Sequence, residues 1–170
     1  MKVEEIIKTT EFLDFYKSAT DYCNFIENYS KQTQIDYLKI LRKKLLNLYE
    51  KALNLQWIEL QSNITYDEKL HDKEIKSILS SLADKLDDKR YYWHVFDPTN
   101  HNDTEPVCGD LADDLGDIYK DLQYSIMIYN LEGEYSKEKA LWQFKFDFDK
   151  HWGDHCINAL TGIHFFLQDE

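Results

Sequence analysis

Apolar residues recur at alternating steps of three and four along most of the chain, the spacing that places them on one face of an α-helix. The clearest series consists of Leu38, Leu41, Leu45, Leu48, Ala52 and Leu55. It predicts a helix over residues 33–58 whose apolar seam packs against a neighbouring helix.

The same spacing predicts four more helices, over residues 3–29, 72–88, 107–130 and 136–167. Polar and turn-forming residues separate them, and Ser136 is a suitable N-cap for the last one. The 170 residues show no internal repeat and suffice to bury one core. We therefore predict an all-α fold, a single-domain bundle of about five helices over residues 1–170.

Residues 91–106 are predicted to form a long irregular loop before the fourth helix. The segment holds both prolines, and Pro98 favours extended backbone at Asp97. Its aromatic residues are Tyr91, Tyr92, Trp93 and Phe96. We expect them to plug one end of the bundle, and a binding loop is the alternative interpretation.

The stretch FKFDFDKHWGDH, residues 144–155, fits two structures. Its alternating phenylalanines suit a strand, whereas His151 and His155, four residues apart, would share one face of a helix. An isolated strand would leave its backbone groups unpaired, so we predict a helix. The two imidazoles then extend the apolar stripe that faces the core. Each needs a hydrogen-bond partner or a metal ion, because a buried unpaired polar group costs about 1–3 kcal/mol.

Two interpretations of the histidine pair remain open. The first is a pair of core histidines bonded to neighbouring carboxylates or carbonyls, and the second is a metal or acid–base site. The spacing resembles half of a zinc protease HExxH motif, but Trp152 stands where the general-base glutamate belongs. Gly153 is costly inside a helix and indicates close approach of another backbone.

An acidic stripe marks the predicted fourth helix. Five aspartates fall within an arc of about 100°, namely Asp110, Asp113, Asp114, Asp117 and Asp121. A solvated face of an amphipathic helix is one explanation. Short carboxylates at this spacing also suit a divalent metal ion, or salt bridges to a basic partner. Asp114 and Asp121 lie nearest the apolar side, so we expect them to reach His151 or His155.

Composition narrows the classes of partner. The formal charge of −12 repels phosphate backbones and anionic lipid, so direct nucleic-acid binding is not expected. No segment has the roughly 20 apolar residues that a membrane helix requires. Three cysteines, Cys23, Cys108 and Cys156, lack the CxxC spacing of a redox or zinc motif. They favour reduced thiols in a cytoplasmic protein.

Three segments together resemble a known family. FDPTNHNDTEPV, DLADDLGDIYKDL and WQFKFDFDKHWGDHCINAL occur in this order. The chain resembles the uncharacterised bacterial family catalogued as domain of unknown function 5063, most specifically over residues 92–165. The resemblance implies an all-helical bacterial domain and assigns no activity. It directs attention to the aspartate stripe and to the residues 151–155.

Two functional hypotheses follow. The first is an adaptor or regulator that docks a basic protein surface through the Asp110–Asp121 face, with Asp110, Asp113 and Asp117 as contacts. The alternative is a metal-dependent or acid–base enzyme, hydrolase-like, with a divalent metal ion as its cofactor. Its candidate metal ligands are Asp114, Asp117, Asp121, His151 and His155. Either histidine is also a candidate general base. A weaker idea is a DNA mimic that presents carboxylates in place of phosphates.

Overall fold

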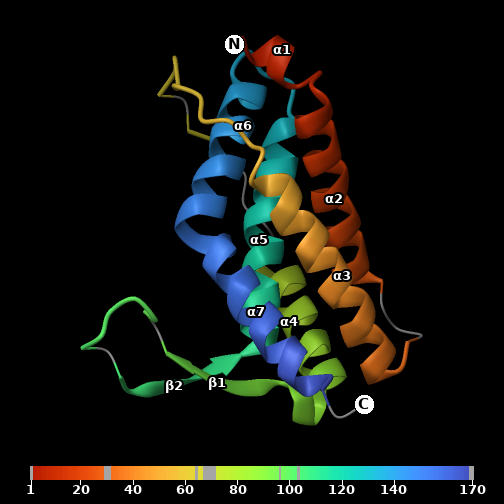
Figure 1. Cartoon of the computed structure of the whole chain (residues 1–170). Coiled ribbons are helices and arrows are strands. Elements are labelled where there is room, and N and C mark those ends of the chain that lie inside the picture. Colours follow the sequence, from red (N-terminus) through yellow and green to blue (C-terminus); the bar gives the residue numbers. More distant parts are fainter. Residues whose placement is uncertain are drawn as a thin grey trace.

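The chain forms an elongated bundle of helices from which a small β-hairpin projects (Figure 1). The computed structural model describes residues 2–28, 32–63, 65–66, 72–95, 97–102 and 104–168. The α-helices are α1 (Val3–Ile6), α2 (Thr10–Glu27), α3 (Gln34–Ala52), α4 (Asp72–Leu86), α5 (Leu111–Tyr129), α6 (Ser136–Asp147) and α7 (Gly153–Phe166). The predicted all-α class is confirmed as a mostly helical fold with one small sheet.

Helix α5 lies in the middle of the bundle and packs against α2, α4, α6 and α7, while α3 packs on α2 and α7 (Figure 1). The predicted seam of α3 is buried from Leu38 to Ala52. This helix ends at Ala52, six residues before the predicted end at residue 58, because the seam stops there and Leu53 is exposed.

The predicted first helix, residues 3–29, is divided in two at Thr9. The Thr9 hydroxyl donates to the carbonyl oxygen of Ile6 at 2.8 Å and accepts from the backbone N–H of Phe12 at 3.3 Å. One side chain therefore ends α1 and caps α2. Helix α2 ends at Glu27, and the predicted end at residue 29 lies outside the described residues.

The loop predicted for residues 91–106 is shorter than expected, because strands occupy both of its ends. Strand β1 (Tyr91–Val95) pairs antiparallel with β2 (Pro106–Asp110), in a register from Tyr91↔Asp110 to Val95↔Pro106. Helix α5 consequently begins at Leu111 rather than at residue 107. Asp110 ends the strand and starts the helix, because its side chain accepts from the backbone N–H of Ala112 at 3.0 Å.

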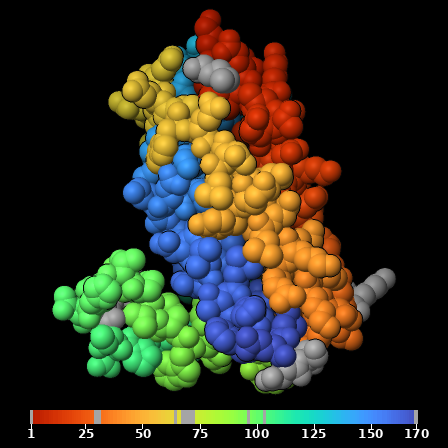
Figure 2. All heavy atoms as spheres, in the orientation of Figure 1, coloured from red at the N-terminus to blue at the C-terminus, as the bar shows by residue number. Residues whose placement is uncertain are grey.

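The aromatic residues of this segment do not act together as a plug. Tyr92 is 8% exposed and packs on the bundle, whereas Tyr91 is exposed and Trp93 is 72% exposed. Phe96 lies outside the described residues. The alternation follows from strand geometry, which points successive side chains to opposite faces. Figure 2 shows the hairpin standing out from the helices.

The stretch 144–155 is helical, as predicted. Helix α6 continues through a π-helical turn, η2 (Phe148–Trp152), directly into α7. A side chain at Gly153 would place its Cβ 2.3 Å from the carbonyl oxygen of Phe148. The close backbone that explains this glycine thus belongs to the π turn of the same helix.

A short 3-10 turn, η1 (Asp87–Lys89), follows α4.

Candidate functional site

Two aspartate–histidine pairs form between α5 and the helix that contains the π turn. Nδ1 of His151 lies 2.6 Å from Oδ2 of Asp121, and Nδ1 of His155 lies 2.8 Å from Oδ1 of Asp114. A carboxylate accepts, so each Nδ1 carries the proton and donates. The expectation that Asp114 and Asp121 reach the histidines is confirmed.

The histidines lie at the edge of the core rather than inside it. The side chain of His151 is 50% exposed and that of His155 is 25% exposed. Trp152, between them, is fully buried. The core-histidine interpretation is therefore wrong for His151. In the π turn its imidazole contacts a carboxylate of α5 instead of lying in the apolar core. Both imidazoles border on solvent.

Asp117 completes the group. Its Oδ2 lies 3.5 Å from Nε2 of His155, and its Oδ1 lies 2.5 Å from Nζ of Lys120. Asp117, His151 and His155 each offer one ligand atom, and the three atoms lie within 4.8 Å of one another. We call Asp114, Asp117, Asp121, His151 and His155 the Asp–His cluster.

Tyr92 is a member of this site that sequence analysis assigned to a loop anchor. Its hydroxyl donates to Oδ2 of Asp114, the carboxylate that also holds His155. The ring fits between two glycines: an added Cβ would approach it to 2.6 Å at Gly109 and to 3.0 Å at Gly162. Burial, followed by the bond to Asp114, raises the pKa of Tyr92, so the phenol remains a donor.

Charge on the cluster is set by burial and by these bonds. The hydrogen bond that His155 donates to Asp114 raises the pKa of His155 against the opposing effect of burial. Burial raises the pKa of Asp121, and the hydrogen bond with His151 offsets part of this rise. Asp114 itself is 6% exposed and lies behind His155, away from solvent. The carboxylate that orients His155 is therefore itself held in place by Tyr92.

Asp147, at the end of α6, was also missed by the sequence analysis. It is buried and accepts a hydrogen bond from Nε2 of Gln143 at 2.7 Å. Burial, together with repulsion from Asp121, raises the pKa of Asp147 to about 7. Asp147 lies four residues before His151, a spacing that puts both side chains on one helix face. This spacing could have identified Asp147 as a neighbour of the site.

The remaining stripe aspartates have different roles. Asp110 forms a two-bond ion pair with Arg90, with Nε–Oδ1 at 2.8 Å and Nη2–Oδ2 at 2.5 Å. It also caps α5, so its position is structural. Asp113 is exposed. Of the three predicted partner contacts, Asp110 and Asp117 are therefore engaged within the chain.

Residues 7–169 match the family described as a domain of unknown function (DUF5063). The chain belongs to this family. The crystal structure of protein BF1032 from Bacteroides fragilis resembles the DUF5063 chain with a TM-score of 0.81 and 20% sequence identity, covering 95% of this chain and 94% of that one. At this identity the likeness shows a shared fold. A search of curated proteins found no match.

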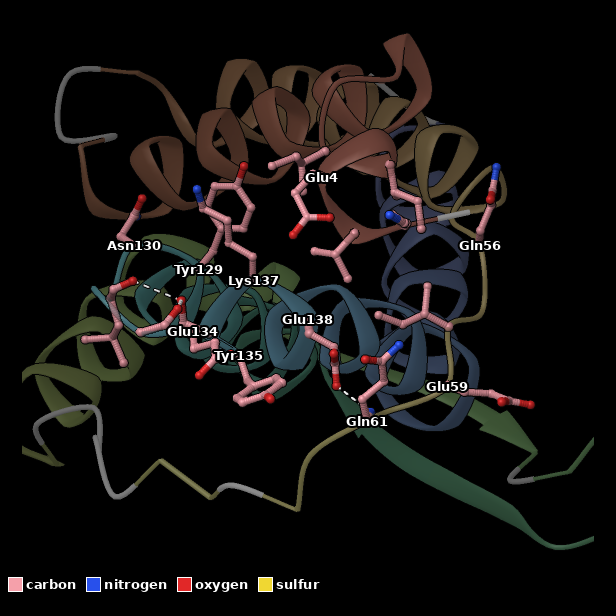
Figure 3. A pocket seen from close by; sticks show the side chains of 18 of the residues that line it. Glu4, Gln56, Glu59, Gln61, Tyr129, Asn130, Glu134, Tyr135, Lys137 and Glu138 are labelled. Atoms are coloured by element: carbon pink, nitrogen blue, oxygen red, sulfur yellow. Dashed lines mark hydrogen bonds between the residues drawn. The ribbon is translucent and has the colours of Figure 1, made fainter.

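A pocket of about 1,090 Å³ lies at the other end of the DUF5063 bundle, between α1, residues 56–61 and the α5–α6 connection (Figure 3). Its carboxylates include Glu138, which is buried and accepts from the backbone N–H of Gln61 at 2.6 Å. No histidine or cysteine is among the described residues that line it. The described residues bring imidazole and carboxylate groups together at the Asp–His cluster and not in this pocket.

No helix in the described part of the DUF5063 chain is both long and apolar enough to cross a membrane. All three cysteines are free thiols, with Cys23 and Cys156 buried and Cys108 exposed on β2. Burial raises the pKa of Cys156 to about 12, so that thiol is inert.

Proposed function

We propose that this DUF5063 protein is a hydrolase-like enzyme whose reaction centre is the Asp–His cluster. One observation carries the proposal: two imidazoles, with ring centroids 4.9 Å apart, are each fixed through Nδ1 by an aspartate. Such pairing sets the tautomer and leaves Nε2 of each ring as the reactive nitrogen. Both rings are accessible to solvent, so water and a substrate reach them.

The chemistry is activation of a water molecule beside the two Nε2 atoms. Nε2 of one imidazole takes a proton from the water, the water oxygen forms a bond to an electrophilic carbonyl carbon, and the bond from that carbon to the leaving group breaks. The imidazolium returns its proton to the leaving group. General acid–base catalysis by a positioned imidazole contributes about 10²–10⁴-fold in rate, and a bound cation achieves the same activation by lowering the pKa of water.

The charge around the cluster favours neutral or cationic esters and amides as substrates. Asp117 and Asp113 act electrostatically on His155 at the surface, and Lys120 offsets only part of this charge. An anionic phosphate ester would be repelled. This electrostatic selection agrees with the net charge of −12.

Docking of a basic partner through the Asp110–Asp121 face ranks second. It is supported by the exposure of Asp113. It is weakened by the ion pairs that already engage Asp110 with Arg90 and Asp117 with Lys120, since a partner would have to displace them. We also propose a bacterial cytoplasmic location, which three free thiols favour.

The test is hydrolysis of a panel of p-nitrophenyl esters and anilides, with p-nitrophenyl phosphate as the anionic comparison. Wild-type protein is expected to cleave one or more neutral or cationic members, and Asp114→Asn to lose at least about 100-fold in kcat. Asp154→Asn is the matched control, because Asp154 is exposed and lies between the two histidines in the chain. Equal rates in all three proteins would reject the proposal.

A further inference from the structure

The two nitrogens left free by the aspartates point to a metal centre. Nε2 of His155 faces Oδ2 of Asp117 at 3.5 Å, although a neutral imidazole with its proton on Nδ1 and a carboxylate are both acceptors there. Two acceptors face each other stably when a cation lies between them.

We propose that Asp117, His151 and His155 bind one divalent ion of the Zn²⁺, Fe²⁺ or Mn²⁺ class, through a carboxylate oxygen and the Nε2 atoms of the two histidines. The inference rests on the Asp–His cluster as the reaction centre of the proposed function and supplies its water-activating group. Mixed nitrogen and oxygen ligation selects these ions, whereas Ca²⁺ and Mg²⁺ prefer oxygen ligands throughout.

The distances allow the ion with a small contraction. Ligand atoms about 2.1 Å from a tetrahedral ion are separated by about 3.4 Å. One ligand atom from each of the three residues lies within 4.8 Å of the other two, so side-chain movements of roughly 1 Å close the site. The two imidazole planes are inclined by 76°, which lets both rings converge on one point without stacking.

The surroundings are those of a catalytic rather than a structural metal site. Asp114 and Asp121 hold the two Nδ1 atoms, and Tyr92 holds Asp114 in turn. Partners of this kind fix the ligands and raise their basicity. Three protein ligands leave a coordination position for water, and the exposed ring of His151 gives solvent access to it.

The backbone contributes through the π turn. His151 lies in η2 and His155 in the first turn of α7, immediately around Gly153. Because Gly153 has no Cβ, the carbonyl of Phe148 can close the π turn there. Single π turns inside α-helices occur frequently at functional sites. Here the turn sets the angular relation of the two ligand-bearing residues.

The experiment uses full-length protein purified without an affinity tag or chelator. Elemental analysis and titration with Zn²⁺, Mn²⁺, Mg²⁺ and Ca²⁺ measure stoichiometry and affinity, and Co²⁺ substitution reports nitrogen ligation through its visible absorption. We expect one equivalent of ion in wild-type protein. Asp117→Asn and His155→Gln should each lose it while keeping the helical circular dichroism signal. Asp114→Asn and Asp121→Asn should weaken affinity by about 10- to 100-fold.

Two exposed residues provide matched controls. His164→Gln and Asp154→Asn change the same residue types on the same helix, away from the proposed ligands, and should retain the ion. Equal binding in the ligand and control variants, binding of Ca²⁺ or Mg²⁺ alone, or no ion in wild-type protein would each overturn the inference.

The two proposals fail separately. Ester hydrolysis by wild-type protein that binds no metal ion would overturn the metal centre and leave the acid–base enzyme. Stoichiometric metal lost in the ligand variants, without hydrolysis of any substrate in the panel, would establish the metal centre and remove the proposed reaction.

Discussion

Tyr92 and Asp114 are joined by a hydrogen bond that ties the hairpin to α5 across 22 residues of chain. The same carboxylate holds His155, so the position of one strand residue bears on the orientation of an imidazole. The hairpin is therefore part of the site and not only a connection between helices.

Replacing Tyr92 by Phe should lower the free energy of unfolding by about 1–3 kcal/mol, because a buried carboxylate loses a donor. It should also raise the pKa of His155 further, since the charge of Asp114 is then shared with one donor fewer. Urea denaturation and NMR titration of the imidazole measure the two effects. Tyr91→Phe, at an exposed neighbouring position, should change stability by less than about 0.5 kcal/mol. Identical behaviour of the two variants would contradict the role of Tyr92.

Gly153→Ala should destabilise the protein by about 1–3 kcal/mol, because the new Cβ would meet the carbonyl oxygen of Phe148 and the π turn would have to shift. Metal affinity should fall with it, since His151 and His155 lie on either side of Gly153. Thermal unfolding and metal titration provide the measurement. Gly133→Ala is the comparison, because its Cβ would meet the end of the Tyr66 side chain at 3.3 Å, and it should be nearly neutral. A neutral Gly153→Ala would show that the turn does not require glycine.

Asp147→Asn should stabilise the protein at alkaline pH. Because burial raises the pKa of Asp147 to about 7, the folded protein retains a proton there that the unfolded chain releases near pH 4. The free energy of unfolding of the wild type therefore falls as pH rises from about 4 to about 7. The amide avoids this loss, for a gain on the order of 1–4 kcal/mol at pH 8 that vanishes near pH 4.

Urea unfolding of the wild type and Asp147→Asn between pH 4 and 8 measures this difference. Asp154→Asn is exposed and should follow the wild type at every pH. A constant difference between wild type and Asp147→Asn across the range would show that Asp147 does not titrate near neutrality.

Lys120→Met should raise the affinity for the divalent ion about fivefold, because the ammonium competes for Asp117 as a part-exposed ion pair worth roughly 1 kcal/mol. Isothermal titration with Zn²⁺ measures it. Lys150→Met removes an exposed charge beside His151 and should have a smaller effect. Weaker binding in Lys120→Met would mean that Lys120 positions Asp117 instead of competing for it.

The sequence was informative where contacts are local. Helical periodicity predicted the buried seam from Leu38 to Ala52. It also put Asp114 and Asp121 nearest the apolar side of their helix, from where they reach the histidines. The hairpin was missed because its strands are separated by 10 residues and pair through a register that periodicity does not encode. Gly109 lies where β2 passes the ring of Tyr92, and a side chain there would collide with that ring. This contact depends on the three-dimensional structure and could not be inferred from the glycine alone.

The burial of the cluster could not be derived for a related reason. Periodicity placed Phe148 and His151 on one side of a regular helix. Both residues lie instead in the π turn, which interrupts the regular helix. The angle at which each residue leaves the helix then departs from the regular 100° step. Asp147 is buried and His151 is half exposed. We attribute this difference to the changed angle at the π turn and to the position of α5.

A π turn differs from an α-helical turn by a single residue. Deleting one residue between Phe148 and Gly153 would restore a regular helix and rotate everything after it by about 100°. His155 would then leave Asp114, and Gly162 would leave the ring of Tyr92. The length of the chain between α6 and α7, counted in single residues, therefore determines whether the cluster and the hairpin contact exist together.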